Sequence, residues 1–245
     1  MNFKVVHIDE TDSTNRWLKE HEDLADEAVV VWADYQTAGR GCGTNTWESE
    51  RGKNLLFSIL IHPQWVKAGE QFFLSMAISN AVRRTLDFYL FPRSEVKWPN
   101  DVYVNDGKVC GILIENRLQG NCIKDCILGI GLNVNQRPFH SDAPNPLSMV
   151  QVDGRCEFDR GHVLNRVLQE FADILDHWNT AVIGSEYRQH LYRRDGFHSY
   201  TDKEGVFQAE MMDVEDDGHL VLRDEDGQVR RYAFKEVQFV VLSSS

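Results

Sequence analysis

The side chains best placed to do chemistry lie in residues 95–115, which read EVKWPNDVYVNDGKVCGILIE. Strand-like runs flank Asp106-Gly107, a pair that favours a two-residue hairpin turn because both turn positions need positive φ. With that turn, Asp101 and Lys108 project from the same side of the hairpin, roughly 13 Å apart between Cα atoms at about 3.3 Å per residue. This spacing excludes a direct ion pair and leaves room for a ligand between the two charges.

The entrance to this hairpin, Lys97-Trp98-Pro99-Asn100-Asp101, is predicted to be stiff. Pro99 fixes its own φ and pushes Trp98 toward an extended conformation, so the polar side chains of this segment are held on a rigid backbone. Gly111 is predicted to face away from Lys108 and to mark a bulge or the close approach of another group to the backbone. An ordinary surface hairpin, with Trp98 in the core and solvated charges, is the alternative.

A glycine-rich loop, Gly39-Arg40-Gly41-Cys42-Gly43, provides a second candidate site. Its glycines allow backbone N–H groups to converge on an anion, and the guanidinium of Arg40 suits phosphate or carboxylate. The spacing is neither a Walker loop nor the G-x-G-x-x-G that opens a dinucleotide-binding helix. The sequence therefore indicates an anion-binding loop, with a flexible turn as the alternative.

These two segments occur in order with DSTN at 12–15 and GIGLNVN at 129–135, and the set resembles the biotin protein ligase family over residues 7–135. The resemblance implies an α+β fold, in which helices flank a mixed β-sheet of the class II aminoacyl-tRNA synthetase type, followed by a small C-terminal SH3-like β-barrel. It also implies a reaction in two steps. The carboxylate of biotin attacks the α-phosphate of ATP, with Mg²⁺ present, to give biotinyl-5′-AMP and pyrophosphate. A lysine of a biotin carboxyl carrier protein then takes the biotin and releases AMP.

By the same resemblance, four charged residues carry the catalysis: Arg40, Lys97, Asp101 and Lys108. Arg40 and Lys108 are expected beside the carboxylate and the α-phosphate, where cationic donors stabilise developing negative charge. Lys97 is expected near the phosphates, with Asn100 as a neutral donor. Asp101 is expected to position magnesium or the incoming amine. The resemblance does not identify the magnesium ligands.

The resemblance also implies a set of residues that contact biotin or the nucleotide. Gln36 and residues 13–15 would satisfy the ureido ring of biotin, although Ser13 could serve only as a helix cap. Trp47 would pack against adenine or else anchor its own loop in the core, and Gly111 would lie against biotin. Asn133 would contact the nucleotide or support the groups that do. The full set is Ser13, Thr14, Asn15, Gln36, Gly39, Arg40, Gly41, Cys42, Trp47, Asn100, Lys108, Gly111 and Asn133.

One position in the glycine-rich loop departs from the family. Cys42 stands where some members carry an arginine that helps to retain the adenylate, and a cysteine cannot supply that charge. Retention is therefore expected to be weaker unless Arg51 or Lys53 compensates from the far end of the loop. Residues 39–52, which include four glycines, are expected to be mobile when empty and to order over the ligand.

The remaining pattern predicts the elements that hold these groups in place. Residues 55–61 form a buried-type strand, residues 71–90 have helical periodicity, and a second apolar stripe covers 163–178 behind Asp159 as its cap. Short strands separated by Asp-Gly turns at 217–218 and 226–227 suggest the small β-domain. We therefore expect a catalytic domain that binds biotin and ATP at 1–195 and a β-domain at 196–245.

Composition narrows the class of protein. A formal net charge of −12 disfavours binding to nucleic acid, and the strand-like run at 3–8 leads straight into DSTN, so no DNA-binding segment is expected before it. The sequence has no run of eighteen apolar residues and no leader signal, which favours a cytoplasmic protein without a membrane contact. Five cysteines without a CxxC spacing argue against structural zinc and suit a reducing compartment.

Two other functions share parts of this pattern. Lipoate or octanoyl transfer would use a related scaffold, and a biotin-sensing interaction protein would bind biotin without catalysis. KWPND, GRG and a trailing β-domain together favour the ligase, whose expected partner is the carrier protein of a biotin-dependent carboxylase. The sequence leaves open whether ligand binding also drives formation of a homodimer.

Overall fold

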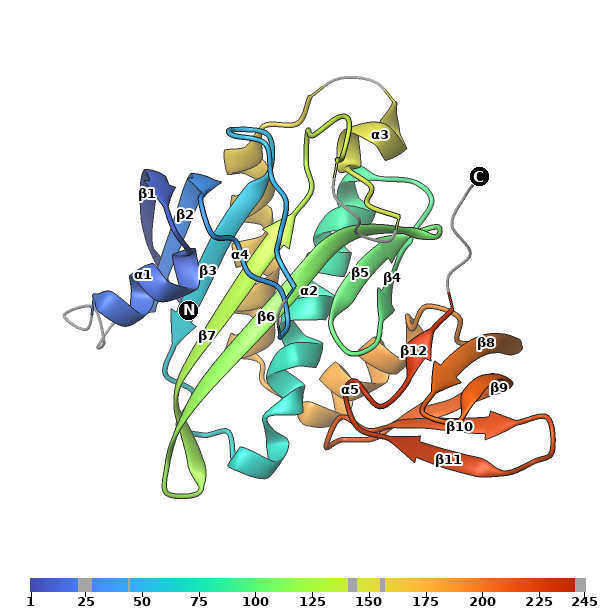
Figure 1. Cartoon of the computed structure of the whole chain (residues 1–245). Coiled ribbons are helices and arrows are strands. Elements are labelled where there is room, and N and C mark those ends of the chain that lie inside the picture. The colour runs from blue at the N-terminus through green and yellow to red at the C-terminus, as the bar shows by residue number, and fades with distance from the viewer. Residues whose placement is uncertain (22–27, 44, 141–144, 155–156, 241–245) are drawn as a thin grey trace.

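The computed structural model describes residues 1–21, 28–43, 45–140, 145–154 and 157–240. Its centre is a mixed sheet of seven strands in the order β1-β2-β3-β7-β6-β5-β4 (Figure 1). β1 pairs with β2 in parallel, and the other neighbours pair antiparallel. The strands are Lys4–Thr11 (β1), Val29–Gln36 (β2), Leu55–Ile61 (β3), Ser94–Lys97 (β4), Asp101–Val104 (β5), Gly107–Gln119 (β6) and Cys122–Leu132 (β7).

Helices cover both faces of this sheet. α2 (Phe72–Tyr89) and α4 (Arg160–Asp176) pack together behind the sheet in Figure 1, and α5 (Thr180–Gln189) contacts α2. The short α1 (Thr14–Glu20) lies against β3 and β7 in front. Because it is covered on both sides, every residue of β3 is buried, as its apolar run predicts. Among the described residues, the other short helices are a 3-10 turn at Ala68–Glu70 and α3 at Met149–Asp153.

The predicted helix boundaries agree closely with the structure. The side chain of Asp159 accepts a hydrogen bond from the backbone N–H of His162 at 2.9 Å, so the predicted cap of α4 is confirmed. α4 ends at Asp176, so Trp178 at the end of the predicted stripe lies beyond the helix. The helix predicted at 71–90 is α2, which is shorter by one residue at each end.

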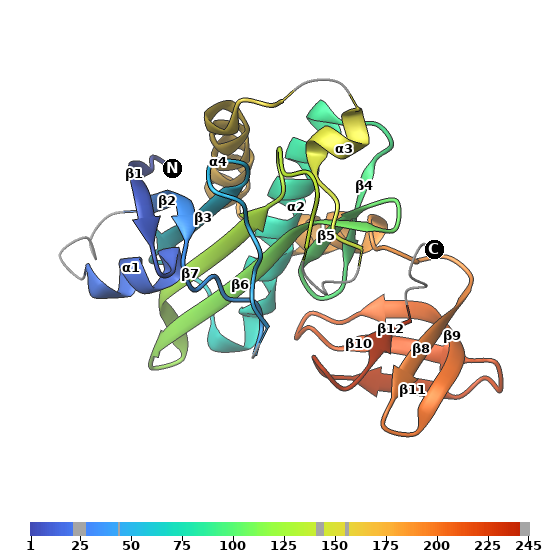
Figure 2. The same ribbon diagram turned by 45° about the horizontal axis from the view of Figure 1, so that its top comes forward.

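A second, smaller sheet follows α5 and is antiparallel throughout, in the order β11-β10-β9-β8-β12 (Figure 2). Its strands are Phe197–Asp202 (β8), Gly205–Val214 (β9), Leu220–Asp224 (β10), Val229–Tyr232 (β11) and Gln238–Phe239 (β12). The predicted α+β class with a small C-terminal β-domain is confirmed. The sheet is open, however, because no pairing between β11 and β12 closes it into a barrel within the described residues. The domain boundary near residue 195 stays a prediction.

The second sheet is joined to the first at Trp98, which is buried. Its indole Nε1 donates a hydrogen bond to the carbonyl of Gly218 at 2.9 Å, and the ring of Phe234 meets it edge-on with centroids 6.2 Å apart. Arg188 of α5 adds a hydrogen bond from its Nε to the carbonyl of Val214 at 2.7 Å. The segment predicted to be stiff is therefore held from the side of the second sheet. Among the described residues, no helix combines the length and apolar character needed to cross a membrane.

Candidate active site

β5 and β6 form the predicted hairpin, but its turn lies one residue earlier than predicted. Val104 pairs with Gly107, so the two residues between them make the turn. Asn105 has a positive φ of 54°, which asparagine tolerates better than most residues. Gly107 lies in β6 instead, where a Cβ would stand 2.6 Å from Leu147 and would clash. The prediction of a turn at Asp106-Gly107 is therefore wrong.

The earlier turn brings Asp101 and Lys108 closer, because Lys108 pairs with Tyr103, two positions from Asp101, and not with Asn105. A β-bulge follows Lys108. The pairing register shifts between Val102 and Tyr103, which leaves Val109 as an extra residue in β6. Lys108 Nζ lies 2.7 Å from Asp101 Oδ2, and the two side chains are 24% and 27% exposed. The prediction that these residues lie too far apart for a direct ion pair is wrong, because the earlier turn reduces their separation along the strands from four positions to two. The two charges form a direct ion pair at the edge of the site.

The bulge at Val109 changes the side of the hairpin on which Gly111 lies relative to Lys108. A Cβ at Gly111 would stand 3.2 Å from Lys108 Cε, so the two residues face the same side and the prediction of opposite sides is wrong. The close approach predicted for Gly111 is confirmed, since the same Cβ would stand 2.7 Å from Trp47 Cζ3.

Trp47 lies on the bare backbone that two glycines provide in neighbouring strands. Gly111 of β6 pairs with Gly131 of β7, and a Cβ at Gly131 would stand 2.4 Å from Trp47 Cε2. The indole nitrogen is buried without a hydrogen-bond partner, and Lys108 Nζ lies 5.7 Å from the ring centre. Trp47 thus anchors its loop on the sheet in this structure. Its contact with adenine stays a prediction.

The glycine-rich loop folds back on itself as a narrow hairpin. Arg40 forms a β-bridge with Thr46, and Gly41 N donates to the carbonyl of Asn45 at 2.7 Å. The guanidinium of Arg40 lies 3.7 Å from the Glu115 carboxylate, which places it toward β6. Cys42 is a free thiol of intermediate exposure.

The two residues predicted to compensate for Cys42 are engaged elsewhere. Arg51 pairs with Glu10 and stacks over the ring of Tyr35, 4.8 Å from its centre. Lys53 Nζ lies 2.7 Å from Glu157 Oε1. Neither carboxylate belongs to the predicted site, so the structure gives no support to compensation by Arg51 or Lys53.

A buried hydrogen-bond network joins the DSTN segment to Gln36. Thr14 donates to Gln36 Oε1 from its backbone N at 2.7 Å and from its hydroxyl at 3.1 Å. The hydroxyl of Ser58 lies 2.7 Å from Thr14 Oγ1 and 2.5 Å from Asn15 Oδ1. Asn15 Nδ2 then donates to Glu115 Oε2 at 2.8 Å. The structure therefore brings together the predicted biotin contacts and fixes their orientation.

Ser58 and Glu115 belong to this network and were not predicted as site residues. Ser58 is the one hydroxyl in the apolar run of β3, which is the signal that could have identified it. Ser13, which was predicted, stands at the N-cap position of α1, but its side chain makes no capping hydrogen bond. A capping role for its hydroxyl is therefore not the explanation for Ser13.

Glu115 lies among cationic and amide donors. Lys19 Nζ donates to its carboxylate at 2.7 Å, in addition to the contacts of Asn15 and Arg40. Partial burial by itself raises the pKa of this carboxyl, but these three donors outweigh burial and hold the pKa below its usual value. Glu115 is therefore an anion that steadies both Arg40 and Asn15.

Lys97 lies at the far side of the Asp101–Lys108 pair, where the second sheet covers it. Its Nζ is 3.2 Å from the hydroxyl of Tyr103 and 5.5 Å from the ring centre of Phe239 in β12. Burial lowers the pKa of Lys97, and Asp101, directly opposite in the β4–β5 pair, partly counteracts that. The structure therefore groups three of the four predicted catalytic residues, while Arg40 faces Glu115.

The two remaining predicted residues turn their amides toward backbone. Asn100 Nδ2 donates to the carbonyl of Ile112 at 2.7 Å, and Asn133 Nδ2 donates to the carbonyl of Leu147 at 3.2 Å. Asn133 Oδ1 is buried without a partner. Both residues hold the strands around Lys108 in place, and their contact with a nucleotide stays a prediction.

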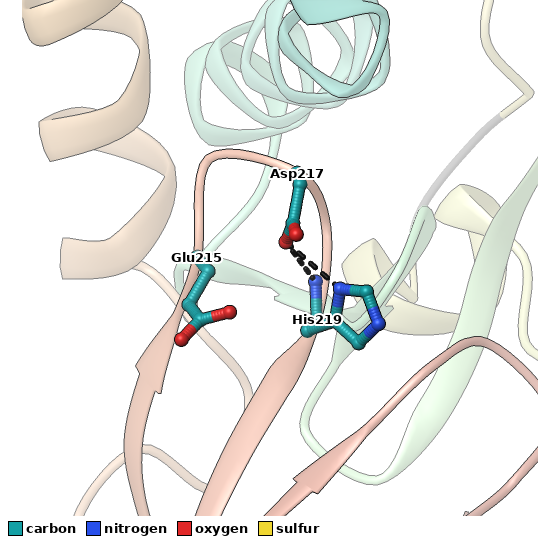
Figure 3. Close-up of side chains that lie close together, drawn as sticks. All are labelled: Glu215, Asp217 and His219. Atoms are coloured by element: carbon teal, nitrogen blue, oxygen red, sulfur yellow. Dashed lines mark hydrogen bonds and ion pairs between the residues drawn. The ribbon is translucent and has the colours of Figure 1, made fainter. Parts of the chain in front are cut away.

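One cluster of metal-type ligands in the described residues lies away from this site. Glu215, Asp217 and His219 meet in the β9–β10 turn (Figure 3). Arg231 already pairs with both carboxylates, at 2.6 Å to Asp217, and His219 Nδ1 lies 2.9 Å from the same aspartate. Both carboxylates are thus already engaged by side-chain partners, so the cluster is a set of surface ion pairs.

The sequence and fold match proteins of known activity. Residues 8–133 match the family described as Biotin/lipoate A/B protein ligase. The chain is 35% identical over 170 residues to a biotin–acetyl-CoA-carboxylase ligase of Paracoccus denitrificans, which covers 67% of each protein. It is 27% identical over 253 residues to the bifunctional ligase/repressor BirA of Bacillus subtilis, covering 95% of this chain and 73% of that protein.

Solved structures agree with this match. A mutant biotin protein ligase of Aquifex aeolicus in complex with biotin superposes with a TM-score of 0.77 at 25% identity, covering 96% of this chain and 97% of the other. The same enzyme with biotin and ATP gives a TM-score of 0.76 at 23% identity, covering 96% and 99%. The chain therefore belongs to the biotin/lipoate A/B protein ligase family.

Proposed function

We propose that the chain is an ATP-dependent biotin protein ligase, which forms biotinyl-5′-AMP and then biotinylates a lysine of a biotin carboxyl carrier protein. The observation that carries this proposal is the strip of Gly111 and Gly131, on which the Trp47 ring lies, with the Asp101–Lys108 pair beside it. Because these strands carry no side chains there, a ring can lie directly on the backbone, and we place the ring system of the ligand on this strip with its negative charge at Lys108. The names of the similar proteins support biotin as that ligand.

In the first step, a carboxylate oxygen of biotin attacks the α-phosphorus of ATP, and the bond to the β-phosphate oxygen breaks. Two anions must approach one another, so the barrier depends on cations already in place. Lys108 is held by Asp101 at the edge of the glycine strip, and Lys97 lies behind this pair. Arg40 on the loop is the third cation, and Glu115 steadies it.

In the second step, the amine of the carrier lysine attacks the carbonyl carbon of the mixed anhydride, and AMP leaves. The amine must arrive without its extra proton and must be aimed at that carbon. Asp101 is partly exposed, so its carboxylate can meet a lysine that approaches from solvent. We assign the positioning of the incoming amine to Asp101.

The vitamin ring is assigned to the Thr14–Gln36 network. A ureido group needs both donors and acceptors when it is buried. Ser58 and Glu115 fix the amide and hydroxyl of the residues that would meet it, so the site is organised before the ligand arrives. This preorganisation reduces the entropy lost on binding.

The donor set fits magnesium delivered with ATP. Mg²⁺ commonly takes one or two carboxylates and completes its shell with phosphate oxygens and water. Asp101 is already paired with Lys108, so it would contact the ion only through a water molecule, and the direct ligands would come from the nucleotide and water. When bound, the ion would offset phosphate charge alongside Lys108 and Lys97.

The remaining features of the proposal follow from this chemistry. The reaction consumes ATP and modifies a carboxylase carrier, so we place it in the cytoplasm. We assign catalysis to residues 1–195 and a supporting role to residues 196–245, since the second sheet holds Trp98 and covers Lys97. We leave nucleic acid out of the partners because the net charge is −12.

Pyrophosphate release tests the proposal directly. The protein is incubated with ATP and, in separate reactions, with biotin, lipoate or octanoate. We expect pyrophosphate release with biotin but not with lipoate or octanoate, followed by a mass increase of an added biotin carboxyl carrier domain. Release with lipoate or octanoate instead would make the chain an acyltransferase of the related type. Biotin binding without release would make it a sensor, and either result would overturn the proposal.

A further inference from the structure

A lysine of the second sheet reaches the tip of the glycine-rich loop. Lys235 lies between β11 and β12, and a Cβ built on Gly43 would stand 2.5 Å from Lys235 Nζ and 3.6 Å from its Cε. Gly43 is in the left-handed conformation, with φ 72°. In Figure 2 the loop that follows β2 extends from the first sheet toward the second sheet, where this contact is made. Two segments far apart in the sequence therefore meet at the end of the loop.

The turn that carries Lys235 is fixed in place. Ala233 N donates to Glu236 Oε2 at 2.8 Å, and Glu236 N donates back to the carbonyl of Ala233 at 3.1 Å. Phe234 packs on the buried Trp98, with ring centroids 6.2 Å apart. Lys235 itself has a φ of 74°, which residues with a Cβ adopt uncommonly. The turn is thus built on the KWPND segment and directs its lysine toward the loop.

The charge of Lys235 is available for a ligand. Its side chain is exposed, and within the part of the chain that the structure describes its ammonium has no carboxylate partner. Its nearest aromatic contact is the ring of Phe234, 5.8 Å from Nζ. The cations of residues 39–53 differ in this respect, because Arg40, Arg51 and Lys53 are each paired with a glutamate.

We propose that Lys235 supplies the positive charge that retains the acyl adenylate beneath the glycine-rich loop, next to the position where Cys42 has none. The inference rests on the proposed ligase function. The loop is predicted to meet an anion, and an unpaired ammonium beside its tip would be drawn to the phosphate of that anion. The contact is partly exposed, so its effect is moderate: we expect loss of the charge to speed escape of the adenylate roughly 5- to 10-fold at low salt.

The test measures adenylate retention in single-site variants. The protein is loaded with biotin and ATP, freed of small molecules by rapid desalting, and the loss of bound biotinyl-AMP is followed over time. Lys235→Gln should lose it about 5- to 10-fold faster than the unchanged protein, and Lys235→Arg should behave like the unchanged protein. Lys203→Gln is the matched control, because Lys203 is an exposed lysine of the same sheet in the β8–β9 turn.

Two further variants separate charge from folding. Lys235→Gly suits the left-handed backbone, so it should fold normally and still lose the adenylate faster. Cys42→Arg, introduced into the Lys235→Gln protein, should restore slow release by returning a cation to the loop. Raised salt should speed release from the unchanged protein and have little effect on Lys235→Gln.

The outcomes distinguish this inference from the proposed function. If the unchanged protein forms no biotinyl-AMP, the ligase function itself fails. If it forms and retains the adenylate, and Lys235→Gln and Lys235→Gly retain it equally well, the role of Lys235 is refuted while the function stands. A matching loss of biotin affinity without ATP would also refute it, because a contact with phosphate leaves biotin alone unaffected.

Discussion

Replacing Lys108 by alanine should slow adenylate formation by more than the loss of one cation. Removing a charge that stabilises a transition state costs roughly 3 to 4 kcal/mol, or about two to three orders of magnitude in rate. In the unchanged protein Asp101 Oδ2 lies 2.7 Å from Lys108 Nζ, and the substitution leaves this carboxylate without that partner. An unpaired carboxylate beside the phosphates repels them.

The size of that repulsion follows from Coulomb's law. Two unit charges ~6 Å apart interact by about 3 kcal/mol at an effective dielectric constant of ~20. The side chains of Asp101 and Lys108 are 27% and 24% exposed, so solvent should reduce this. About 1 to 2 kcal/mol remains after screening, which corresponds to roughly another order of magnitude in rate. Lys108→Ala should therefore be about three to four orders of magnitude slower.

A double variant isolates the two contributions. Asp101→Asn, combined with Lys108→Ala, removes the unpaired charge. The double variant should form the adenylate about tenfold faster than Lys108→Ala alone. The assay is single-turnover pyrophosphate release with saturating biotin and ATP. Arg223→Ala is the control, because it breaks a comparable ion pair with Glu210, of 2.8 Å, in the second sheet. A Lys108→Ala rate near that of the unchanged protein, or a double variant slower than the single one, would refute this reasoning.

Three further outcomes are expected. Ser58→Ala should weaken biotin binding about 5- to 30-fold in calorimetry, since one buried hydrogen bond that orients Thr14 and Asn15 is worth roughly 1 to 2 kcal/mol, and the KM for ATP should not change. Because burial lowers the pKa of Lys97, the KM for ATP should rise at alkaline pH before an ordinary lysine would lose its proton, and Lys97→Arg should move that rise to higher pH. Trypsin should cut residues 39–53 readily in the free protein and slowly with biotin plus ATP, and equal rates in both states would argue against a loop that orders over its ligand.

Local signals predicted much of the fold. The apolar run of β3 gave its exact bounds because the strand is buried on both faces, and Asp159 identified the start of α4 because its carboxylate satisfies a free backbone N–H. The Asp-Gly turns at 217–218 and 226–227 lie where β9, β10 and β11 reverse direction. Each of these features depends on residues that are close in sequence, so a short window contains the information.

The details of the hairpin could not be predicted in this way. Asn105-Asp106 and Asp106-Gly107 are both acceptable two-residue turns, and local preference favoured the second. Leu147, about 40 residues away, occupies the space where a side chain of residue 107 would lie, and no local signal shows this contact. The position of the turn determines that Lys108 meets Asp101, and the bulge at Val109, which has no sequence signal, determines that Gly111 faces the same side as Lys108.

The same limit explains which site residues were missed. Ser58 and Glu115 join the site through Asn15, which lies 43 positions from Ser58 and 100 positions from Glu115 in the sequence. Lys235 reaches Gly43 from the other end of the chain. Family resemblance predicts the groups that would touch ligand. It could not locate the groups that hold them, because those contacts exist only in the folded protein.

The indole of Trp47 on Gly111 and Gly131 has a thermodynamic consequence for vitamin uptake. The Trp47 ring already covers this apolar strip. A biotin ring that takes its place exchanges one apolar contact for another and removes little additional surface from water. The heat capacity change of biotin binding should therefore be smaller than the contact area of the bound ring suggests. Trp47→Ala should make that change more negative by leaving the strip wet until the vitamin covers it.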